Sequence, residues 1–264
     1  MELRDSTALI TGATGGIGQA IAHTLHSRGA KLILTGRRED VLNTLAGEVD
    51  GKVIVADLGD RGDVDRLATE CADVDVLIAN AGLGATGHAV DLDTAAIDTA
   101  LDVNLRAPII LAQGIGAAMA KRGRGQIVLV SSLSGITGSP RSSLYNATKF
   151  GLRGFGQGLR SDLRDHGVGV SVVFPGFVSD AGMFADAGVK LPFYVGTSTP
   201  QQVADGVVSA IERNRGEVVV APFTMKIGTK VASLAPDLAA GIQRRAGSER
   251  LAEEMTEGQS GWSD

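Results

Sequence analysis

Tyr145 and Lys149 are the residues whose types and spacing most directly suggest chemistry. They lie four positions apart within residues 143–149, so on a helix they share one face. A free tyrosine ionises near pH ~10, too high for proton transfer at neutral pH, but a nearby cation lowers the pKa of a phenol. The pair is therefore a candidate proton donor for carbonyl reduction. Taken alone, the same pattern also fits a packed tyrosine beside a solvated lysine.

Apolar runs along the chain indicate the scaffold that must position this pair. Continuous Val/Ile/Leu/Ala runs, typical of parallel strands buried on both faces, alternate with helical segments. The strands are expected at 8–11, 31–35, 52–56, 74–79, 126–130, 169–174 and 217–220. The helices are expected at 16–28, 39–47, 60–71, 93–120, 143–165 and 200–213. The alternation predicts an α/β fold, a Rossmann-like doubly wound sheet of about seven parallel strands with helices on both faces.

Distinctive residues fall just after the expected strands, where open parallel sheets bind their ligands. The first strand runs into a glycine-rich turn at 11–18. Its glycines allow a close approach of the backbone to a pyrophosphate, and the following helix N-terminus offers donors. The later strand ends carry Gly36-Arg37-Arg38, Asp57-Leu58, Asn80-Ala81-Gly82, Ser131-Ser132 and Pro175-Gly176. This edge of the sheet is therefore a candidate dinucleotide site.

The second strand end distinguishes between the two nicotinamide dinucleotides. NAD-binding sheets place an acidic residue there, which accepts a hydrogen bond from the ribose 2′-hydroxyl. This chain instead has Gly36, followed by Arg37 and Arg38. A carboxylate would repel a 2′-phosphate, whereas guanidinium groups bind one with paired hydrogen bonds. The alternative is two solvated arginines that begin a helix. The pattern favours NADP(H) over NAD(H).

In these motifs the chain resembles the short-chain dehydrogenase/reductase family over residues 5–222. The motifs occur in the family's order: Thr-Gly-x-x-x-Gly-Ile-Gly at 11–18, Asn-Ala-Gly at 80–82, Asn104, Ser132, Tyr145-x-x-x-Lys149 and Pro175-Gly176. The glycines at 12, 15 and 18 also fit the family's longer, sugar-nucleotide-modifying branch. That branch has a separate C-terminal substrate domain, which we do not expect here. The resemblance therefore implies the single-domain, NADP(H)-preferring branch.

The resemblance also implies roles for individual residues. Tyr145 would be the acid–base, Lys149 would hold the nicotinamide ribose and lower the pKa of Tyr145, and Ser132 would bind the substrate oxygen. Asn104 would support a water-linked proton relay to Lys149, and Asn80 would brace the central sheet. The implied cofactor-binding residues are Gly12, Thr14, Gly15, Gly16, Ile17, Gly18, Arg37, Arg38, Asp57, Leu58, Asn80, Ala81, Gly82, Tyr145, Lys149, Pro175, Gly176 and Val178.

Two positions depart from the family pattern. Asp180 stands where a threonine often contacts the cofactor, and a carboxylate beside a pyrophosphate is unfavourable. Gly15 stands where many NADP-dependent members carry a basic residue, so Arg37 and Arg38 would have to hold the 2′-phosphate alone. The sequence thus predicts a phosphate site that depends on the two arginines after the second strand.

The expected domain comprises residues 1–222, with a substrate lid at 180–199. The lid segment has no clear periodicity and contains apolar residues such as Phe184 and Phe193, which suits an apolar or neutral carbonyl compound; covering the core or a subunit contact is the alternative. Residues 223–264 are expected to form a C-terminal helical extension, broken at Gly228, Pro236 and Gly241, and then an acidic tail. A membrane-surface role for 223–246 is a further alternative.

Composition limits the partners. The net charge is −5 and aromatic residues make up only 4%, which argues against nucleic-acid binding. The basic cluster Lys121, Arg122 and Arg124 is interpreted as a solvated loop. The four histidines and the single cysteine, Cys71, have no metal-ligand spacing and allow no intrachain disulfide. We find no signal-peptide pattern and no apolar run near the ~18 residues of a membrane span. We therefore expect no metal, no stable membrane insertion and a cytoplasmic location.

The resemblance implies an NADPH-dependent oxidoreductase that reduces a small-molecule ketone or aldehyde, or oxidises the alcohol. A non-catalytic NADP(H)-sensing or scaffold protein on the same fold is the alternative from another functional class. The helices near 93–120 and 143–165 carry many small residues, which allow close helix packing, and the family commonly pairs these helices. A homodimer or homotetramer is therefore expected.

Overall fold

The computed structural model describes residues 1–179, 196–235, 237 and 241. Within them, seven strands form one wholly parallel sheet in the order β3-β2-β1-β4-β5-β6-β7. The strands are β1 (Thr7–Thr11), β2 (Lys31–Gly36), β3 (Lys52–Val55), β4 (Val76–Ala79), β5 (Gly125–Val130), β6 (Val168–Pro175) and β7 (Glu217–Val220). The strand order reverses between β1 and β4, so the sheet is doubly wound as predicted.

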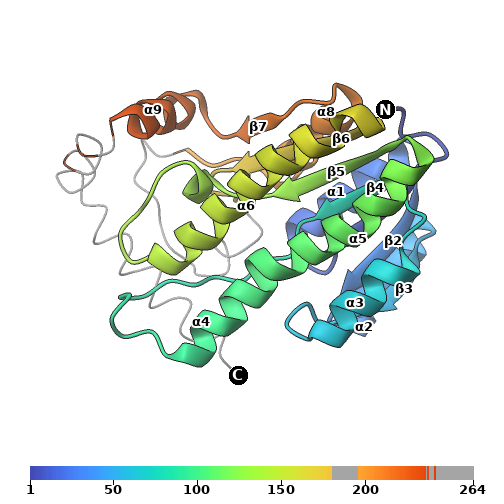
Figure 1. Cartoon of the computed structure of the whole chain (residues 1–264), viewed down its shortest axis with the longest axis horizontal. Helices are drawn as coiled ribbons and strands as arrows, with labels where there is room; N and C mark the ends of the chain where they lie inside the picture. Colours follow the sequence, from blue (N-terminus) through green and yellow to red (C-terminus); the bar gives the residue numbers. More distant parts are fainter. Residues whose placement is uncertain (180–195, 236, 238–240, 242–264) are drawn as a thin grey trace.

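Helices cover both faces of the sheet (Figure 1). One face carries α1 (Gly16–Ser27), α2 (Glu39–Val49) and α8 (Pro200–Glu212), and the other carries α3 (Arg61–Glu70), α5 (Ala107–Arg122) and α6 (Ser143–Leu163). Each layer buries its own apolar cluster against the sheet; Ile21 of α1 and Leu111 of α5, for example, are fully buried. The strands are therefore apolar on both sides, which explains their continuous apolar runs.

The helix expected at 93–120 is divided into three parts. It begins as α4 (Thr94–Leu101), continues as the π-helical segment η1 (Asp102–Arg106) and ends as α5. Asp93 caps its N-terminus, because its side chain accepts a hydrogen bond from the backbone N–H of Ala96. The π-helical turn is where Asn104 lies, and π-helical turns of this kind are often found at functional sites.

The helix that follows β7 differs from the expectation. Helix α9 (Phe223–Leu234) runs through Gly228 without a break, although the sequence predicts an interruption there. A glycine weakens a helix without ending it. The buried residues Thr229 and Ala232, which follow Gly228, attach α9 to the rest of the protein. The end at Ala235 precedes Pro236, which disfavours a continued helix. That α9 belongs to the same domain as residues 1–222 stays a prediction.

Arg122 corrects one further expectation. Its guanidinium donates to the carbonyl oxygens of Ala72 and Val74, at 2.9 and 2.7 Å, and pairs with Asp73 at 3.5 Å. Arg124 likewise pairs with Asp75 at 3.3 Å. The cluster therefore ties the end of α5 to the loop before β4 instead of forming only a solvated surface.

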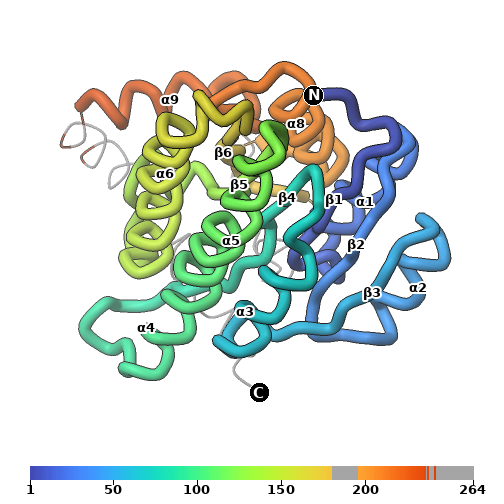
Figure 2. The backbone as a smooth tube through the Cα atoms, turned by 45° about the vertical axis from the view of Figure 1, so that its right-hand side comes forward, coloured from blue at the N-terminus to red at the C-terminus, as the bar shows by residue number. Residues whose placement is uncertain are grey.

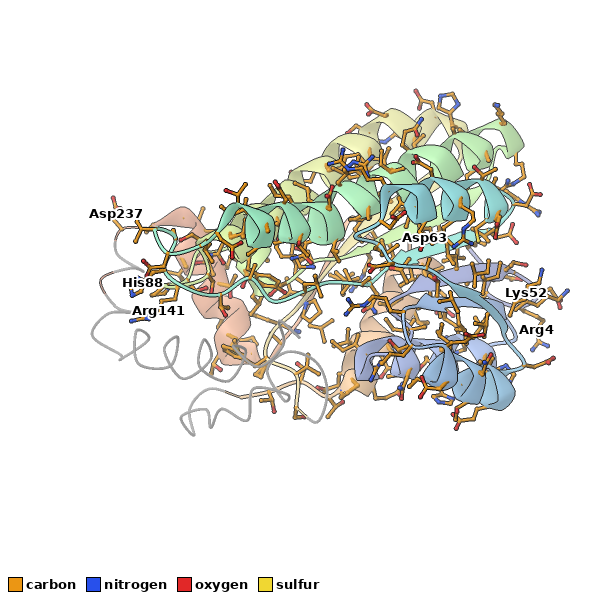
Figure 3. The ribbon with its side chains drawn as sticks, turned by 90° about the horizontal axis from the view of Figure 1, so that it is seen from below. Arg4, Lys52, Asp63, His88, Arg141 and Asp237 are labelled. Atoms are coloured by element: carbon orange, nitrogen blue, oxygen red, sulfur yellow. The ribbon has the colours of Figure 1, made fainter. Side chains whose placement is uncertain are left out.

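The carboxyl ends of the strands meet at one end of the molecule. Arg4, which precedes β1, and Lys52, which begins β3, lie at the opposite end from His88 and Arg141, which follow β4 and β5 (Figure 3). At the end where the strands finish, Val178 forms a parallel bridge with Ser198, so the segment between these two residues begins and ends at adjacent points. Most of the expected lid, 180–195 with Asp180, Phe184 and Phe193, and the tail at 242–264 lie outside the described residues.

One helix among the described residues has the length and composition of a membrane span. It is the continuous helix at 94–122, with a mean hydropathy of 1.2 over its most apolar window, of which 50% is buried. Figure 2 shows it in the helical layer between α3 and α6. Its apolar residues therefore serve the core of the fold.

Candidate active site

The turn after β1 is shaped by three glycines with different constraints. Gly12 has a φ of 65°, and a Cβ on it would lie 2.8 Å from the Cα of Ala81. A Cβ on Gly18 would collide with the carbonyl oxygen of Gly12, so this position lets α1 pack against the turn. Gly15 is different, because a Cβ there would meet no protein atom closer than 3.7 Å. Packing therefore explains two of the glycines, and the third leaves open space in front of the helix N-terminus.

Asn80 joins the ends of the two central strands. Its side-chain amide donates to the carbonyl oxygens of Thr11 and Gly12, at 3.0 and 3.3 Å. The Thr11 hydroxyl in turn accepts from the backbone N–H groups of Asn80 and Ala81, at 3.0 and 3.1 Å. These bonds hold the glycine-rich turn beside the segment after β4. Thr11 is a partner that the sequence did not reveal, because its role depends on the pairing of β1 with β4.

Gly36 and Arg38 both contact Thr14, on the neighbouring turn. A Cβ on Gly36 would lie 3.1 Å from the Thr14 methyl carbon and 3.3 Å from its hydroxyl. The Arg38 guanidinium donates to the Thr14 carbonyl oxygen at 2.7 Å, and Arg37 is exposed beside it. The space that an acidic side chain at position 36 would need is thus narrowed by Thr14, and the Arg38 guanidinium binds the same residue.

The residues after β3 and after β6 are arranged differently from each other. Asp57 is exposed and its carboxylate accepts from the backbone N–H of Gly59 at 2.9 Å, whereas the Leu58 side chain is buried in the core. After β6, Gly176 donates to the carbonyl oxygen of Val220 at 2.9 Å. A Cβ on Gly176 would lie 3.3 Å from Leu133 and 3.7 Å from Met225, so the backbone here passes between apolar side chains.

Ser132, Tyr145 and Lys149 come together from β5 and α6. Ser132 follows β5, accepts from the backbone N–H of Ser134 at 3.1 Å and is hydrogen-bonded to the side chain of Tyr145. Lys149 is only 3% exposed; its Nζ lies 5.6 Å from the centre of the Tyr145 ring and donates to the carbonyl oxygen of Val130 at 3.2 Å. The structure therefore places the three side chains in one cluster.

Burial dominates the electrostatics of this cluster. It raises the pKa of Tyr145 to about 12, although the hydrogen bond from Ser132 acts in the opposite direction. It lowers the pKa of Lys149 to about 8. The sequence predicts that Lys149 lowers the pKa of Tyr145; in the protein alone the net shift is upward and arises from burial, opposed by the Ser132 hydrogen bond. The physical reason is desolvation, which disfavours both the phenolate and the ammonium.

Asn104 is buried and binds the segment after β4. Its side-chain amide accepts from the backbone N–H of Leu83 at 2.7 Å and donates to the carbonyl oxygen of Leu83 at 2.9 Å. A Cβ on Gly82 would lie 3.3 Å from Asn104 Oδ1 and 3.3 Å from Lys149 Nζ. Gly82 therefore keeps open a small space between the two polar groups. Nothing in the sequence indicates the two hydrogen bonds between Asn104 and Leu83.

Ser131 and Gly135, for which the sequence predicts no role, hold α6 in place. The Ser131 hydroxyl donates to the carbonyl oxygen of Lys149 at 3.0 Å, and a Cβ on Gly135 would lie 2.6 Å from the same oxygen. Only a glycine at position 135 lets the turn after β5 approach α6 this closely. Nothing in the local sequence distinguishes it from an ordinary turn glycine.

The order and geometry of these residues match a known family. The sequence profile described as short chain dehydrogenase matches residues 6–190. This chain belongs to the short-chain dehydrogenase family. It is therefore an oxidoreductase of that family, and the resemblance predicted from the motifs is confirmed.

Individual members of the family support the assignment. A ketoacyl reductase, HetN, of a Nostoc species is 35% identical over 227 residues, which cover 83% of this chain and 79% of that protein. The solved bulky-bulky ketone specific alcohol dehydrogenase from Comamonas testosteroni has a TM-score of 0.76 and 27% identity, covering 89% of this chain and 94% of that one. A metagenomic short-chain oxidoreductase in complex with NADP has a TM-score of 0.71 and 31% identity, covering 84% and 99%.

Three features of the described residues fit a nicotinamide dinucleotide. The open space at Gly15 faces the start of α1, whose N-terminus has no side-chain cap, so its first N–H groups can receive a phosphate. The gap at Gly82 adjoins Lys149 Nζ. Among the described residues, that ammonium has one acceptor for its three donors, which leaves donors for ribose hydroxyls. The donor set therefore suits a phosphorylated, hydroxylated ligand.

Proposed function

We propose that this protein is an NADPH-dependent reductase of an apolar or neutral ketone or aldehyde. The observation that carries the proposal is the cluster of Ser132, Tyr145 and Lys149 beside the open glycine positions. The bound cofactor would supply the hydride. Tyr145 would supply the proton to the substrate oxygen, and Ser132, already hydrogen-bonded to Tyr145, would contact the same oxygen. Two donors aimed at one developing negative charge lower the barrier most effectively.

The raised pKa of Tyr145 favours reduction at neutral pH. With a pKa of about 12, the phenol keeps its proton and can donate it. Oxidation of an alcohol needs the phenolate, so its rate should increase with pH. Lys149 carries its charge below a pKa of about 8 and would hold the ribose of the cofactor there. Asn104, whose Oδ1 lies beside Gly82 as Lys149 Nζ does, would support the water-linked proton relay to Lys149.

An apolar substrate is supported by the surroundings of Gly176. Gly176 directly follows β6, a Cβ on it would lie within 4 Å of Leu133 and Met225, and Leu133 follows Ser132 in the chain. The names of the Nostoc and Comamonas proteins refer to ketoacyl and bulky ketone substrates. We therefore expect larger apolar ketones to be better substrates than small or charged ones.

Consumption of NADPH across a panel of ketones and aldehydes tests the proposal. Turnover of apolar members, lost on replacement of Tyr145, would support a reductase. NADPH binding without turnover of any member in either direction would favour the alternative of a cofactor-sensing or scaffold protein on this fold.

Cofactor preference gives a quantitative prediction. We expect NADPH to bind more tightly than NADH, and Arg37→Ala or Arg38→Ala to weaken NADPH binding by about tenfold to a hundredfold while NADH binding changes little. The reason is that a guanidinium recognises the 2′-phosphate, which NADH lacks. Fluorescence titration of both cofactors measures this, with Arg4→Ala, at the far end of the molecule, as control. Equal dissociation constants in the unmodified protein would contradict the prediction.

The contact between Thr14 and Gly36 provides a second test of cofactor preference. Gly36→Asp supplies the carboxylate that NADH would need, but its Cβ would lie only 3.1 Å from the Thr14 methyl carbon. We therefore expect Gly36→Asp alone to weaken both cofactors. The double variant Thr14→Ala/Gly36→Asp should bind NADH more tightly than either single variant. If the two substitutions were simply additive, Thr14 would have no part in cofactor preference.

Assembly is a separate prediction. We expect a homodimer or homotetramer in which helices of the layer formed by α4, α5 and α6 pair across a two-fold axis. The outer face of α6 carries the exposed Phe150, and a Cβ on Gly154 or Gly158 would meet nothing within 4 Å. Light scattering at micromolar concentration should give a multiple of 27.1 kDa. A monomer mass would exclude this assembly, and Phe150→Lys should weaken it if it forms.

A further inference from the structure

Helix α9 exposes an apolar stripe on the side that faces away from the protein. Phe223, Ile227, Val231 and Leu234 are 76%, 50%, 48% and 81% exposed. At the spacing of an α-helix these four positions fall on one narrow face. We call them the outer stripe. They are four of the nine large apolar residues that are markedly exposed in the described part of the chain.

The inner face of α9 already has its own contacts. Thr229 and Ala232 are 8% and 7% exposed, and Met225 packs with the core beside Gly176. The outer stripe is therefore not needed to attach the helix to the protein. A surface helix normally presents polar residues on this side, and Figure 2 shows α9 at the periphery of the molecule. Concentrated apolar exposure of this kind marks an interaction surface.

Charge indicates what the outer stripe binds. Lys226 and Lys230 are exposed and, at helical spacing, lie along one edge of the stripe. The sequence has no acidic residue from 218 to 236, although the whole chain carries a net charge of −5. Exposed apolar side chains beside lysines, on a helix that lies along a surface, are suited to the boundary of an anionic lipid bilayer.

A second copy of this chain fits the outer stripe less well. A two-fold contact through α9 would place Lys226 and Lys230 near the same lysines of the other copy, with no acidic partner on the helix. An anionic lipid surface instead brings negative headgroups to the two lysines.

We infer that α9 docks this protein reversibly on anionic membrane surfaces through the outer stripe, with Lys226 and Lys230 contacting the lipid headgroups. Met225 on the inner face lies 3.7 Å from where a Cβ on Gly176 would be, and Leu133, which follows Ser132 in the chain, lies 3.3 Å from the same point. Docking would therefore bring the functional end of the sheet near the bilayer, where apolar ketones concentrate. The helix lies in the plane of the surface and does not span the membrane.

Flotation of the purified full chain with lipid vesicles tests the inference. One vesicle preparation contains phosphatidylcholine only, and the other contains phosphatidylcholine with phosphatidylglycerol. We expect binding to the anionic vesicles that weakens at high ionic strength. Lys226→Gln/Lys230→Gln should reduce it by about tenfold or more, whereas Lys52→Gln/Lys121→Gln, the same change of charge elsewhere, should not.

The outer stripe is tested with Phe223→Ser/Leu234→Ser. Both side chains are largely exposed, so the fold should be kept, and Val90→Ser, at a loop residue that is 91% exposed, is the matched control. We expect the stripe variant to lose vesicle binding and the control to keep it, with both retaining NADPH turnover in the absence of vesicles. Failure of the unmodified protein to float, or equal flotation of the stripe variant, would overturn the inference. So would a change of oligomeric mass in the stripe variant, which would identify the stripe as a contact between copies.

Discussion

Replacing Tyr145 with phenylalanine is expected to reduce ketone turnover about a thousandfold while NADPH binding is unchanged. The substitution removes the transferable proton but keeps the ring, which lies 5.6 Å from Lys149 Nζ. It also removes the hydrogen bond to Ser132. Stopped-flow measurement of NADPH oxidation gives the rate, and fluorescence titration gives the cofactor affinity.

Two serine variants complete this test. Ser132→Ala should lower turnover by about a hundredfold, because one donor to the substrate oxygen is lost. Ser134→Ala, two positions away, leaves the Ser132 hydroxyl and the backbone N–H of residue 134 in place and serves as control. The chain has only two tyrosines, Tyr145 and Tyr194. If Tyr145→Phe kept most of its activity, Tyr194 would be the next candidate donor and the proposed chemistry would be wrong.

Replacing Lys149 with methionine is expected to abolish turnover and at the same time stabilise the fold at neutral pH. Burial lowers the pKa of the Lys149 ammonium from 10.5 to about 8, which corresponds to a destabilisation of about 3 kcal/mol while the group is charged. Methionine removes that cost, and losing the hydrogen bond to Val130 takes back about 1 kcal/mol. The net gain should raise the thermal midpoint by several degrees.

The pH dependence distinguishes this explanation from a general packing effect. The folded-state pKa of Lys149 is depressed, so the cost of the buried charge is complete below about 8 and disappears as the pH rises toward 10.5. The stability advantage of Lys149→Met should shrink over that range. Lys121→Met, at an exposed position, should show no such trend. A Lys149→Met protein that is less stable than its parent below pH 8 would contradict the direction of the pKa shift.

The sequence by itself determined the fold, and it predicted which residues form the candidate catalytic cluster. Strands buried on both faces leave continuous apolar runs, and a wholly parallel sheet puts every strand's carboxyl end at one edge. Linear order was therefore enough to predict that the glycine-rich turn, Ser132 and the Tyr145–Lys149 pair would lie near one another. The family match confirms that the protein is an oxidoreductase.

Only the tertiary structure decided how these groups are held and charged. The bonds between Asn104 and Leu83, the contact of Thr14 with Gly36 and the close approach at Gly135 join segments far apart in the chain, so no local pattern records them. The direction of the Tyr145 pKa shift depends on how much water surrounds the phenol. The sequence shows a neighbouring cation but not the burial, and in the folded protein the loss of solvation outweighs the lowering effect of the Ser132 hydrogen bond.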